Sequence, residues 1–486
     1  MRIIGNDPSV PRQEHAVASG TMTNGTAVIV NADGTVSTVS GSDTTSGTAV
    51  QFESGNISRP KSAYDTTNNR VVIVYADLGN SYYGTAVVGT VSGTSISFGT
   101  PVVFNSAQSN GSMSIVFDDN AGKVVISYQD GGTNQGESVV GTVDSSDNSI
   151  SFGSVADFLT NDFSQLVAAY DSNLNKVLLV YRDQNTSNRG AAVVGTVSGT
   201  SISFGSQALF TADTPSRANV CFDSNANKFL IAYVDSGDSY KGKSVVATIS
   251  GTSVSFGSEV TFHDASTDYI GTSFDSDTNK ILVVYEDTAD SNKGKAVVGT
   301  ISGTDVSYGS EVEIGNSSAA LAEPGVVYDT NLDAHIITSR PDSATRTLET
   351  IAAQVSGTTA TFSSSVSLTN SVSDEIAFPI FDPDTNKVIL AYRDENDSGK
   401  GKAIVLTPGL GSNITSENYI GIARSGAASG AGAIIDTQGA IADNLSGLTA
   451  GQSYFVQNDG TLGTTAADPS VFAGTAVSAT KLIVKG

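Results

Sequence analysis

The sequence predicts an all-β protein organised around a seven-bladed β-propeller with four antiparallel strands in each blade. Three observations lead to this fold class: a repeat of about 53 residues, four strand-like segments within each repeat, and one blade that is divided between the two ends of the repeat array. An aromatic residue followed by Asp recurs at intervals of 52 to 54 residues, which is too regular for chance. The aromatic residues of these pairs are Tyr64, Phe117, Tyr170, Phe222, Phe274, Tyr328 and Phe381.

The four strand-like segments follow the same order in each repeat. The first ends at the aromatic-Asp pair, and the second is an almost continuous apolar run such as 280–285, typical of a strand that is covered on both faces. The third follows a glycine, as in 294–301, and a Ser-Gly-Thr turn at 302–304 leads to a short fourth segment. Radially arranged blades explain this pattern, and an open stack of repeats is the alternative.

The ends of the array favour a closed ring. The seventh repeat supplies three strands and its pattern stops at Pro408, whereas the segment 46–52 aligns with the segment 98–104 that completes the first repeat. We therefore expect a strand from the N-terminal side to complete the last blade. The predicted domains are an N-terminal β-hairpin segment at 1–44, the propeller at 45–408, and a C-terminal β module for attachment or assembly at 409–486.

Composition excludes several classes of function. The 486 residues carry a formal net charge of −24, and such a surface repels the phosphates of nucleic acids and anionic membranes. Cys221 is the single cysteine, so an internal disulfide is impossible. No apolar run reaches the roughly 18 residues of a membrane span. The first residues lack the apolar stretch of a secretory signal. We therefore expect no nucleic-acid partner, no membrane insertion and no signal peptide.

The two ends of the chain share a pattern. Residues 22–35 match residues 448–461, and both segments carry an Asp-Gly pair between alternating residues, which is a strong hairpin signal. Ring closure would bring both ends out at one blade, so these hairpins can pack as one accessory unit. The stretch 425–432 is too poor in side-chain volume to build a core alone, and we expect the N-terminal segment or a partner chain to complete it.

Both ends also resemble structural proteins of tailed phages, marine cyanophages especially. The N-terminal resemblance lies at 2–13 and 30–37. The C-terminal resemblance, to a module that ends many fibre-like and other virion proteins, lies at 419–423, 447–456, 459–462 and 473–482. The resemblance covers about a quarter of the chain and implies a virion protein made in the host cytoplasm. Its terminal modules would mount it on capsid, neck or tail proteins, and could also form a homo-oligomer. Its propeller would be exposed as decoration, fibre head or adhesin for a host-surface glycan.

A second series of aspartates is the candidate binding site. These residues follow the second strand-like segment, and in several repeats basic residues such as Lys243 and Lys295 come next. The series is Asp77, Asp130, Asp183, Asp235, Asp287 and Asp394, with Asp342 one residue out of place in the sixth repeat. Two interpretations are open: a ring of ligand-binding carboxylates on one propeller face, or an Asp that caps the same turn in every copy.

Little in the sequence points to catalysis, to a metal or to any other cofactor. His15, His263 and His335 have no metal-ligand spacing, and His263 with Asp264 reads as part of a polar loop. Asp-rich turns such as 275–279 are explained by side-chain capping, with calcium as the alternative. The chain has no Trp and its repeats look alike, so we predict a protein that is not an enzyme. A glycosidase-like propeller enzyme and a cellular surface adhesion protein are the alternative functions, and the irregular sixth repeat is where catalysis would be sought.

Overall fold

The computed structural model describes residues 12–109, 111–314, 321–340, 346–369, 372–376, 378–467 and 469–485. The chain divides into two compact units, one of Thr44–Pro408 and one that combines Met1–Asp43 with Gly409–Gly486. Apart from short 3-10 helices, the regular elements of the described part are β-strands. The all-β fold class predicted from the sequence is therefore confirmed. No described helix has the length and apolarity that a membrane crossing requires.

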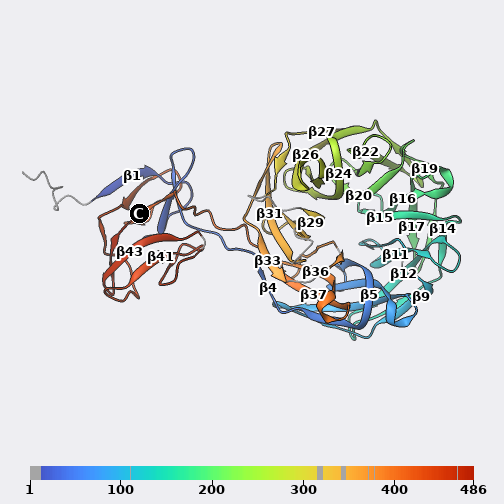
Figure 1. The fold of residues 1–486 in the computed structure, drawn as a ribbon, viewed down its shortest axis with the longest axis horizontal. Helices are drawn as coiled ribbons and strands as arrows, with labels where there is room; N and C mark the ends of the chain where they lie inside the picture. Colours follow the sequence, from blue (N-terminus) through green and yellow to red (C-terminus); the bar gives the residue numbers. More distant parts are fainter. Residues whose placement is uncertain are drawn as a thin grey trace, which may run out of the picture. The chain divides into compact units, whose positions relative to one another are not determined.

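The strands of Thr44–Pro408 are arranged around a common centre and follow one another in sequence order (Figure 1). The first three repeats contain β4 (Thr45–Ser46), β5 (Val50–Asp65), β6 (Arg70–Asp77), η1 (Leu78–Asn80), β7 (Tyr83–Ser92), β8 (Ser95–Phe98), β9 (Val102–Gln108), β10 (Met113–Asp118), β11 (Lys123–Asp130), β12 (Gln135–Asp144), β13 (Ser149–Phe152), β14 (Ala156–Leu159), β15 (Phe163–Asp171), β16 (Lys176–Asp183), η2 (Gln184–Thr186), β17 (Arg189–Ser198), β18 (Ser201–Phe204) and β19 (Ala208–Leu209).

The later repeats contain β20 (Pro215–Asp223), β21 (Lys228–Asp235), β22 (Lys241–Ser250), β23 (Ser253–Phe256), β24 (Val260–Asp275), β25 (Lys280–Asp287), η3 (Thr288–Asp290), β26 (Lys293–Ser302), β27 (Asp305–Tyr308), β28 (Val312–Glu313), β29 (Ala322–Asp329), β30 (Ala334–Arg340), β31 (Leu348–Ser356), β32 (Thr359–Phe362), β33 (Val366–Thr369), β34 (Val372–Ile376), β35 (Ile380–Asp382), β36 (Lys387–Asp394), η4 (Glu395–Asp397) and β37 (Lys400–Thr407).

Each repeat folds as an antiparallel sheet. In the first, β6 pairs with the later part of β5, β7 pairs with β6, and β8 and β9 both pair with β7. The same order recurs in β10–β14, β15–β19 and β29–β33. In the last repeat, β37 pairs with β4 and with residues 50–56 of β5, so strands from both ends of the repeat array share one sheet.

The core of this unit lies between neighbouring sheets. The second strand of each repeat is buried along almost its whole length, as in Ile281–Tyr285, because a sheet covers each of its faces. One cluster, for example, packs Val72 and Val74 of the first repeat against Val124 and Ile126 of the second. The continuous apolar runs of the sequence are explained by this burial, which drives the sheets together.

The Ser-Gly-Thr turns fix how neighbouring repeats approach each other. Gly303 has a φ of +64°, a conformation that side chains disfavour. The turn then places the carbonyl oxygen of Thr304 against Gly257 of the preceding repeat, 1.8 Å from where a Cβ on that residue would lie. Both glycines are therefore required by the backbone, one for the turn and one for the close approach.

The other unit consists of two five-stranded antiparallel sheets. The first has the order β1-β39-β38-β2-β3 and contains strands from both ends of the chain, whereas the second has the order β40-β44-β43-β41-β42. The strands are β1 (Gln13–Val17), β2 (Ala27–Val30), β3 (Val36–Thr38), β38 (Tyr419–Ala423), β39 (Gly432–Asp436), β40 (Ile441–Ala442), β41 (Ser453–Val456), β42 (Leu462–Gly463), β43 (Val471–Ser478) and β44 (Lys481–Val484). One apolar cluster joins the two sheets.

Candidate functional site

The predicted ring of aspartates caps turns. Each described carboxylate follows the second strand of its repeat and accepts a hydrogen bond from the backbone N–H two residues later. These donor–acceptor distances are 2.9 Å at Asp77, 2.7 Å at Asp130, 2.9 Å at Asp183, 2.8 Å at Asp235, 3.0 Å at Asp287 and 3.0 Å at Asp394. Asp342 lies outside the described residues. The capping interpretation accounts for this pattern, and ligand binding by the ring stays a prediction.

The lysines noted in the sequence use the other carboxylate oxygen. Lys243 Nζ lies 2.6 Å from Asp235 Oδ2, Lys295 Nζ lies 2.6 Å from Asp287 Oδ2, and Lys402 Nζ lies 2.8 Å from Asp394 Oδ2. In the third repeat, Gln207 donates to Asp183 instead, at 2.8 Å. These partners neutralise or satisfy carboxylates that the turns have partly buried.

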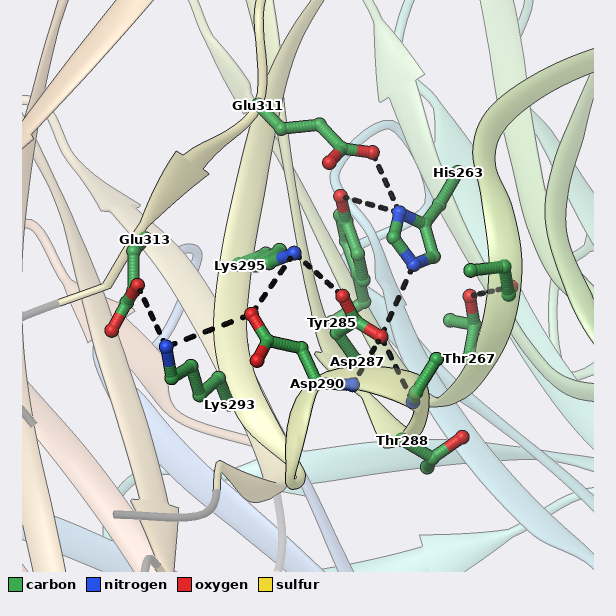
Figure 2. Close-up of polar contacts among 12 residues, drawn as sticks. His263, Thr267, Tyr285, Asp287, Thr288, Asp290, Lys293, Lys295, Glu311 and Glu313 are labelled. Carbon is green, nitrogen blue, oxygen red and sulfur yellow. Dashed lines mark hydrogen bonds and ion pairs between the residues drawn. The ribbon is translucent and has the colours of Figure 1, made fainter. Parts of the chain in front are cut away.

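His263 belongs to the same kind of network in the fifth repeat. Figure 2 shows its ring between Glu311, Tyr285 and Asp287. Nδ1 lies 2.6 Å from Glu311 Oε1 and 3.4 Å from the Tyr285 hydroxyl, and Nε2 lies 3.4 Å from Asp287 Oδ1. The prediction of a polar loop is wrong here, because His263 is buried within β24. Its neighbour Asp264 instead points to Lys241, at 2.9 Å.

The Asp-rich turns bring three carboxylates together at one place among the described residues, namely Asp275, Asp277 and Asp333. The hydroxyl oxygen of Tyr328 lies 2.6 Å from Asp277 Oδ2 and 2.7 Å from Asp333 Oδ1, so its one hydrogen can be donated to either carboxylate. Asp275 caps its own turn through the backbone N–H groups of Asp277 and Thr278. Hydrogen bonds within the protein therefore explain the cluster, and calcium binding stays an untested alternative.

A cavity that the sequence analysis did not find lies between the first strands of the repeats. Figure 1 shows β15, β20 and β29 on the inner side of their sheets. Several of these strands carry a β-bulge near their start, where the register with the second strand shifts. A bulge bends a strand and re-aims a side chain, and such bulges are frequent beside functional sites.

The bulge residues differ in chemistry from repeat to repeat. Five of them have a positive φ, which is strained for a residue with a side chain. They are Arg59 (51°), Gln165 (62°), Arg217 (51°), Tyr269 (39°) and Glu323 (53°). Ser112 occupies the equivalent place in the second repeat. All six line one cavity of about 630 Å³, together with Lys61, Asp162 and Phe378.

The cavity opens at the same end of the strands as the predicted aspartate ring. Ser58, beside Arg59, pairs with Ala76, and Asp77 follows directly. The cavity therefore lies at the end of the strands where the aspartate ring was predicted, but another series of residues lines it. The aspartates recur in nearly every repeat, whereas the cavity is lined by a position at which the repeats differ.

Arg217 is the centre of the polar contacts in the cavity. Its Nε lies 2.8 Å from Asp268 Oδ1, its guanidinium lies 4.1 Å from the centre of the Tyr269 ring, and its backbone N–H donates to Gln165 Oε1 at 3.1 Å. Burial opposes the charge on Arg217, but Asp268, Tyr269 and Glu323 raise its pKa overall. Burial also raises the pKa of Tyr269. The arrangement holds the guanidinium of Arg217 over one face of the Tyr269 ring.

Glu286 lies on the strand next to Asp268, the carboxylate that contacts Arg217. It is 6% exposed and lies opposite Asp268 in the register of β24 and β25. Burial, and then the nearby charge of Asp268, raise the pKa of Glu286 to about 7, although Arg217 works in the opposite direction. Asp268 has a cationic partner in Arg217, whereas the raised pKa of Glu286 comes mainly from its burial.

The remaining walls are held by further side-chain contacts. Lys61 Nζ lies 4.8 Å from the centre of the Phe378 ring. Gln129 Nε2 donates to Asp162 Oδ1 at 2.6 Å and to the carbonyl oxygen of Phe163 at 3.2 Å. These contacts hold a second cation–aromatic pair and a second carboxylate in the cavity wall.

Comparison with known proteins gives matches among solved structures only. No family model and no curated protein matches the chain. The BP39L lectin from Burkholderia pseudomallei matches with a TM-score of 0.55 and 12% identity, over 74% of this chain and 98% of that one. A mutant NanB sialidase from Streptococcus pneumoniae has a TM-score of 0.43 and 12% identity, over 74% of this chain and 70% of that one. An intramolecular trans-sialidase from Ruminococcus gnavus has a TM-score of 0.42 and 10% identity, over 73% of this chain and 96% of that one.

The likeness to the lectin shows a β-propeller-like fold. Two predictions from the sequence are wrong. The matching fold is that of a lectin, which gives no support to a virion structural protein. The exclusion of an enzyme also fails. Its premise that all repeats offer equivalent surroundings does not hold at the bulge residues. The resemblance of the ends to phage proteins stays a prediction.

Proposed function

We propose that this chain is a carbohydrate-active β-propeller that binds a saccharide in the cavity between its first strands. The cavity carries this proposal because one position of the repeat supplies Arg, Ser, Gln, Tyr and Glu residues to one lining. Sugar rings present apolar C–H faces to aromatic rings and hydroxyl groups to charged or amide side chains. A volume of about 630 Å³ lies in the range of ligand pockets.

We also propose that the propeller has seven blades and is closed by β5. Two pairings support closure: residues 50–56 of β5 pair with β37 of the last repeat, and its later residues pair with β6 of the first. Closure gives the cavity a continuous wall and leaves no sheet edge between the first and last repeats.

Truncation tests the closure. Removal of residues 1–55 deletes the part of β5 that pairs with β37, whereas removal of residues 1–44 leaves it in place and serves as the matched control. We expect the longer deletion to lower the melting temperature of the propeller or to cause aggregation, while the control melts like the full chain in that unit. Equal melting of both variants would contradict closure by β5.

Saccharide binding can be tested with the full chain on a glycan array, followed by calorimetry with the best glycan. We expect Arg217→Ala and Tyr269→Ala to reduce affinity at least tenfold, because each removes a wall of the cavity. Tyr240→Ala is the aromatic control, since Tyr240 is 55% exposed in a loop outside the cavity. Loss of binding in the Tyr240 variant but not in the cavity variants, or no glycan bound at all, would overturn the proposal.

Hydrolysis of the bound glycan is the second candidate function. Two carboxylates from different repeats, Asp162 and Glu323, line the cavity, and glycoside hydrolysis uses a pair of carboxyl groups. Release of reducing ends from the glycan that binds, abolished by both Asp162→Asn and Glu323→Gln, would establish this activity. Binding without release in the full chain would assign the cavity to recognition alone.

A further inference from the structure

The unit formed by the two ends of the chain contains the same five-stranded sheet twice. Reading each sheet from edge to edge, β1, β39, β38, β2 and β3 correspond to β40, β44, β43, β41 and β42. Both copies are antiparallel throughout. The strands also follow one another in the same order along the chain, with Thr44–Pro408 placed between the third and fourth strands of the first copy.

The correspondence extends to individual hydrogen bonds. In the first copy, Asn31 N–H donates to the carbonyl of Thr35 at 2.8 Å, and Thr35 Oγ1 donates to Asp33 at 2.6 Å. In the second copy, Gln457 donates to Thr461 at 2.8 Å, and Thr461 Oγ1 donates to Asp459 at 2.6 Å.

The same bulge follows in each copy. It separates the pairs Val28–Gly421 and Ile29–Tyr419 in the first, and the pairs Tyr454–Gly474 and Phe455–Phe472 in the second. Equal strand order, equal turns and equal bulges define two copies of one module.

The two copies pack head to tail, which means that different faces of the module meet. In the first copy, the face with Ala27 and Ile29 lies in the shared apolar cluster. Their equivalents in the second copy are Ser453 and Phe455, but the residues of that copy in the shared cluster are Tyr454 and Val456, from the opposite face. We call the face with Ala27 and Ile29 the back face of the module, and the face with Tyr454 and Val456 the front face. Because side chains alternate along a strand, the contact joins the back face of the first copy to the front face of the second.

Head-to-tail packing leaves one face of each kind on the outside. The outer back face of the second copy carries Phe455 and Phe472, whose ring centres lie 5.5 Å apart and whose side chains are half-buried. The front face of the first copy is mostly covered within the chain, because Val28 lies in a buried cluster with Ala18 and Met22. Its accessible part carries Ile420, half-buried, and Val30, 39% exposed, where the second copy has the fully buried Val456. The two outer faces are thus the same pair of faces that already meet inside the chain.

We propose that two chains associate through these terminal modules, with the Phe455–Phe472 face of one chain packed on the Val30–Ile420 face of another. The partner on each face is a second copy of this chain. The reason is that the back face of the first module already packs on the front face of the second within one chain, and the contact between chains would repeat that packing. Such a contact is heterologous: it uses different surfaces on the two chains and generates a ring or a linear array. The inference does not depend on saccharide binding by the propeller.

Light scattering on the full chain at about 0.3 M salt tests this, since salt screens repulsion between chains of charge −24. We expect a mass of at least two chains at tens of micromolar. Phe472→Glu and Val30→Glu should each yield monomers, while Val103→Glu, which alters a propeller side chain that is 41% exposed, should not. Circular dichroism and thermal melting confirm that each variant is folded.

Mixing decides the geometry. Phe472→Glu keeps an intact front face and Val30→Glu keeps an intact back face, so an equimolar mixture of the two should form a species of two chains, one of each variant. A monomeric full chain would overturn the proposal, as would a mixture that stays monomeric. A Val30→Glu variant that still associates would show that the contact uses one face only, and would overturn head-to-tail packing.

Discussion

Replacement of Lys243 by Met is the most informative test of how the repeats are held together. Lys243 is 7% exposed, and its Nζ lies 2.6 Å from Asp235, 3.0 Å from Asp238 and 2.9 Å from Glu259. The side chain of Asp235 is fully buried. Met keeps the length and the apolar stem of lysine but removes the charge, so the variant leaves a buried carboxylate with only the backbone N–H of Gly237 as a partner.

The expected loss follows from that burial. Removal of one partner from a buried ion pair costs about 3–5 kcal/mol, because the remaining charge cannot return to water. The entropy of unfolding for a unit of this length is roughly 0.8 kcal/mol per degree, from about 2.1 cal/mol/K per residue. We therefore expect the melting temperature of Thr44–Pro408 to fall by about 4–6 °C.

The repeats provide matched controls for this measurement. Lys295 and Lys402 occupy the same position, with side chains that are 18% and 20% exposed. The Asp394 carboxylate that Lys402 would leave behind is itself 14% exposed, and the Asp287 carboxylate that Lys295 would leave behind keeps His263 Nε2 at 3.4 Å. Differential scanning calorimetry at pH 7 should therefore rank Lys243→Met as more destabilising than Lys295→Met or Lys402→Met. Equal shifts for all three, or a shift below 1 °C for Lys243→Met, would refute the role assigned to burial.

Two pH-dependent predictions concern other buried groups. The pKa of Glu286 is raised to about 7 from 4.5, so the unfolded chain releases the proton first and stability falls as pH rises from about 4.5 to 7. Glu286→Gln should remove this fall and gain about 2 kcal/mol at pH 8 relative to pH 5, with solvent screening allowed for. Burial lowers the pKa of His335 to about 4 from 6.5, so stability falls as pH drops through that window. His335→Phe, which copies Phe229 of the fourth repeat, should abolish that acid-side loss in melting experiments at pH 4 to 7. An unchanged pH profile in either variant would count against the corresponding assignment.

The fold class was readable from the sequence because its signals are local and repeated. The run 280–285, rich in β-branched residues, predicted a strand covered on both faces, and β25 spans Lys280–Asp287 with most of its side chains buried. The Ser-Gly-Thr pattern predicted tight turns, and Gly303 has the positive φ that such a turn needs. Both signals depend on a few neighbouring residues, so the chain displays them without its tertiary structure.

The candidate site was not readable in the same way. The aspartates that recur in each repeat stabilise turns, whereas the cavity is lined by residues that differ between repeats, such as Arg217, Tyr269 and Glu323. No local pattern marks these residues, since a bulge arises from the register between two strands. A comparison of the repeats position by position would have revealed them, as the place where the side chain changes class from copy to copy.

The position of the cavity follows from the geometry of a repeat protein. A residue retained in all repeats has nearly equivalent surroundings in each, so it can stabilise a turn many times but cannot read an asymmetric ligand. A sugar has two dissimilar faces and unevenly placed hydroxyls, and its recognition requires different side chains converging on one point. The bulges in the first strands of five repeats meet that requirement, because each places a different residue in the cavity lining while the sheets behind them stay alike. The strained φ values of Arg59 and Tyr269 are tolerated because pairing with the second strand continues on both sides of each bulge. The bulge residues can therefore differ from repeat to repeat because the paired sheets around them are alike.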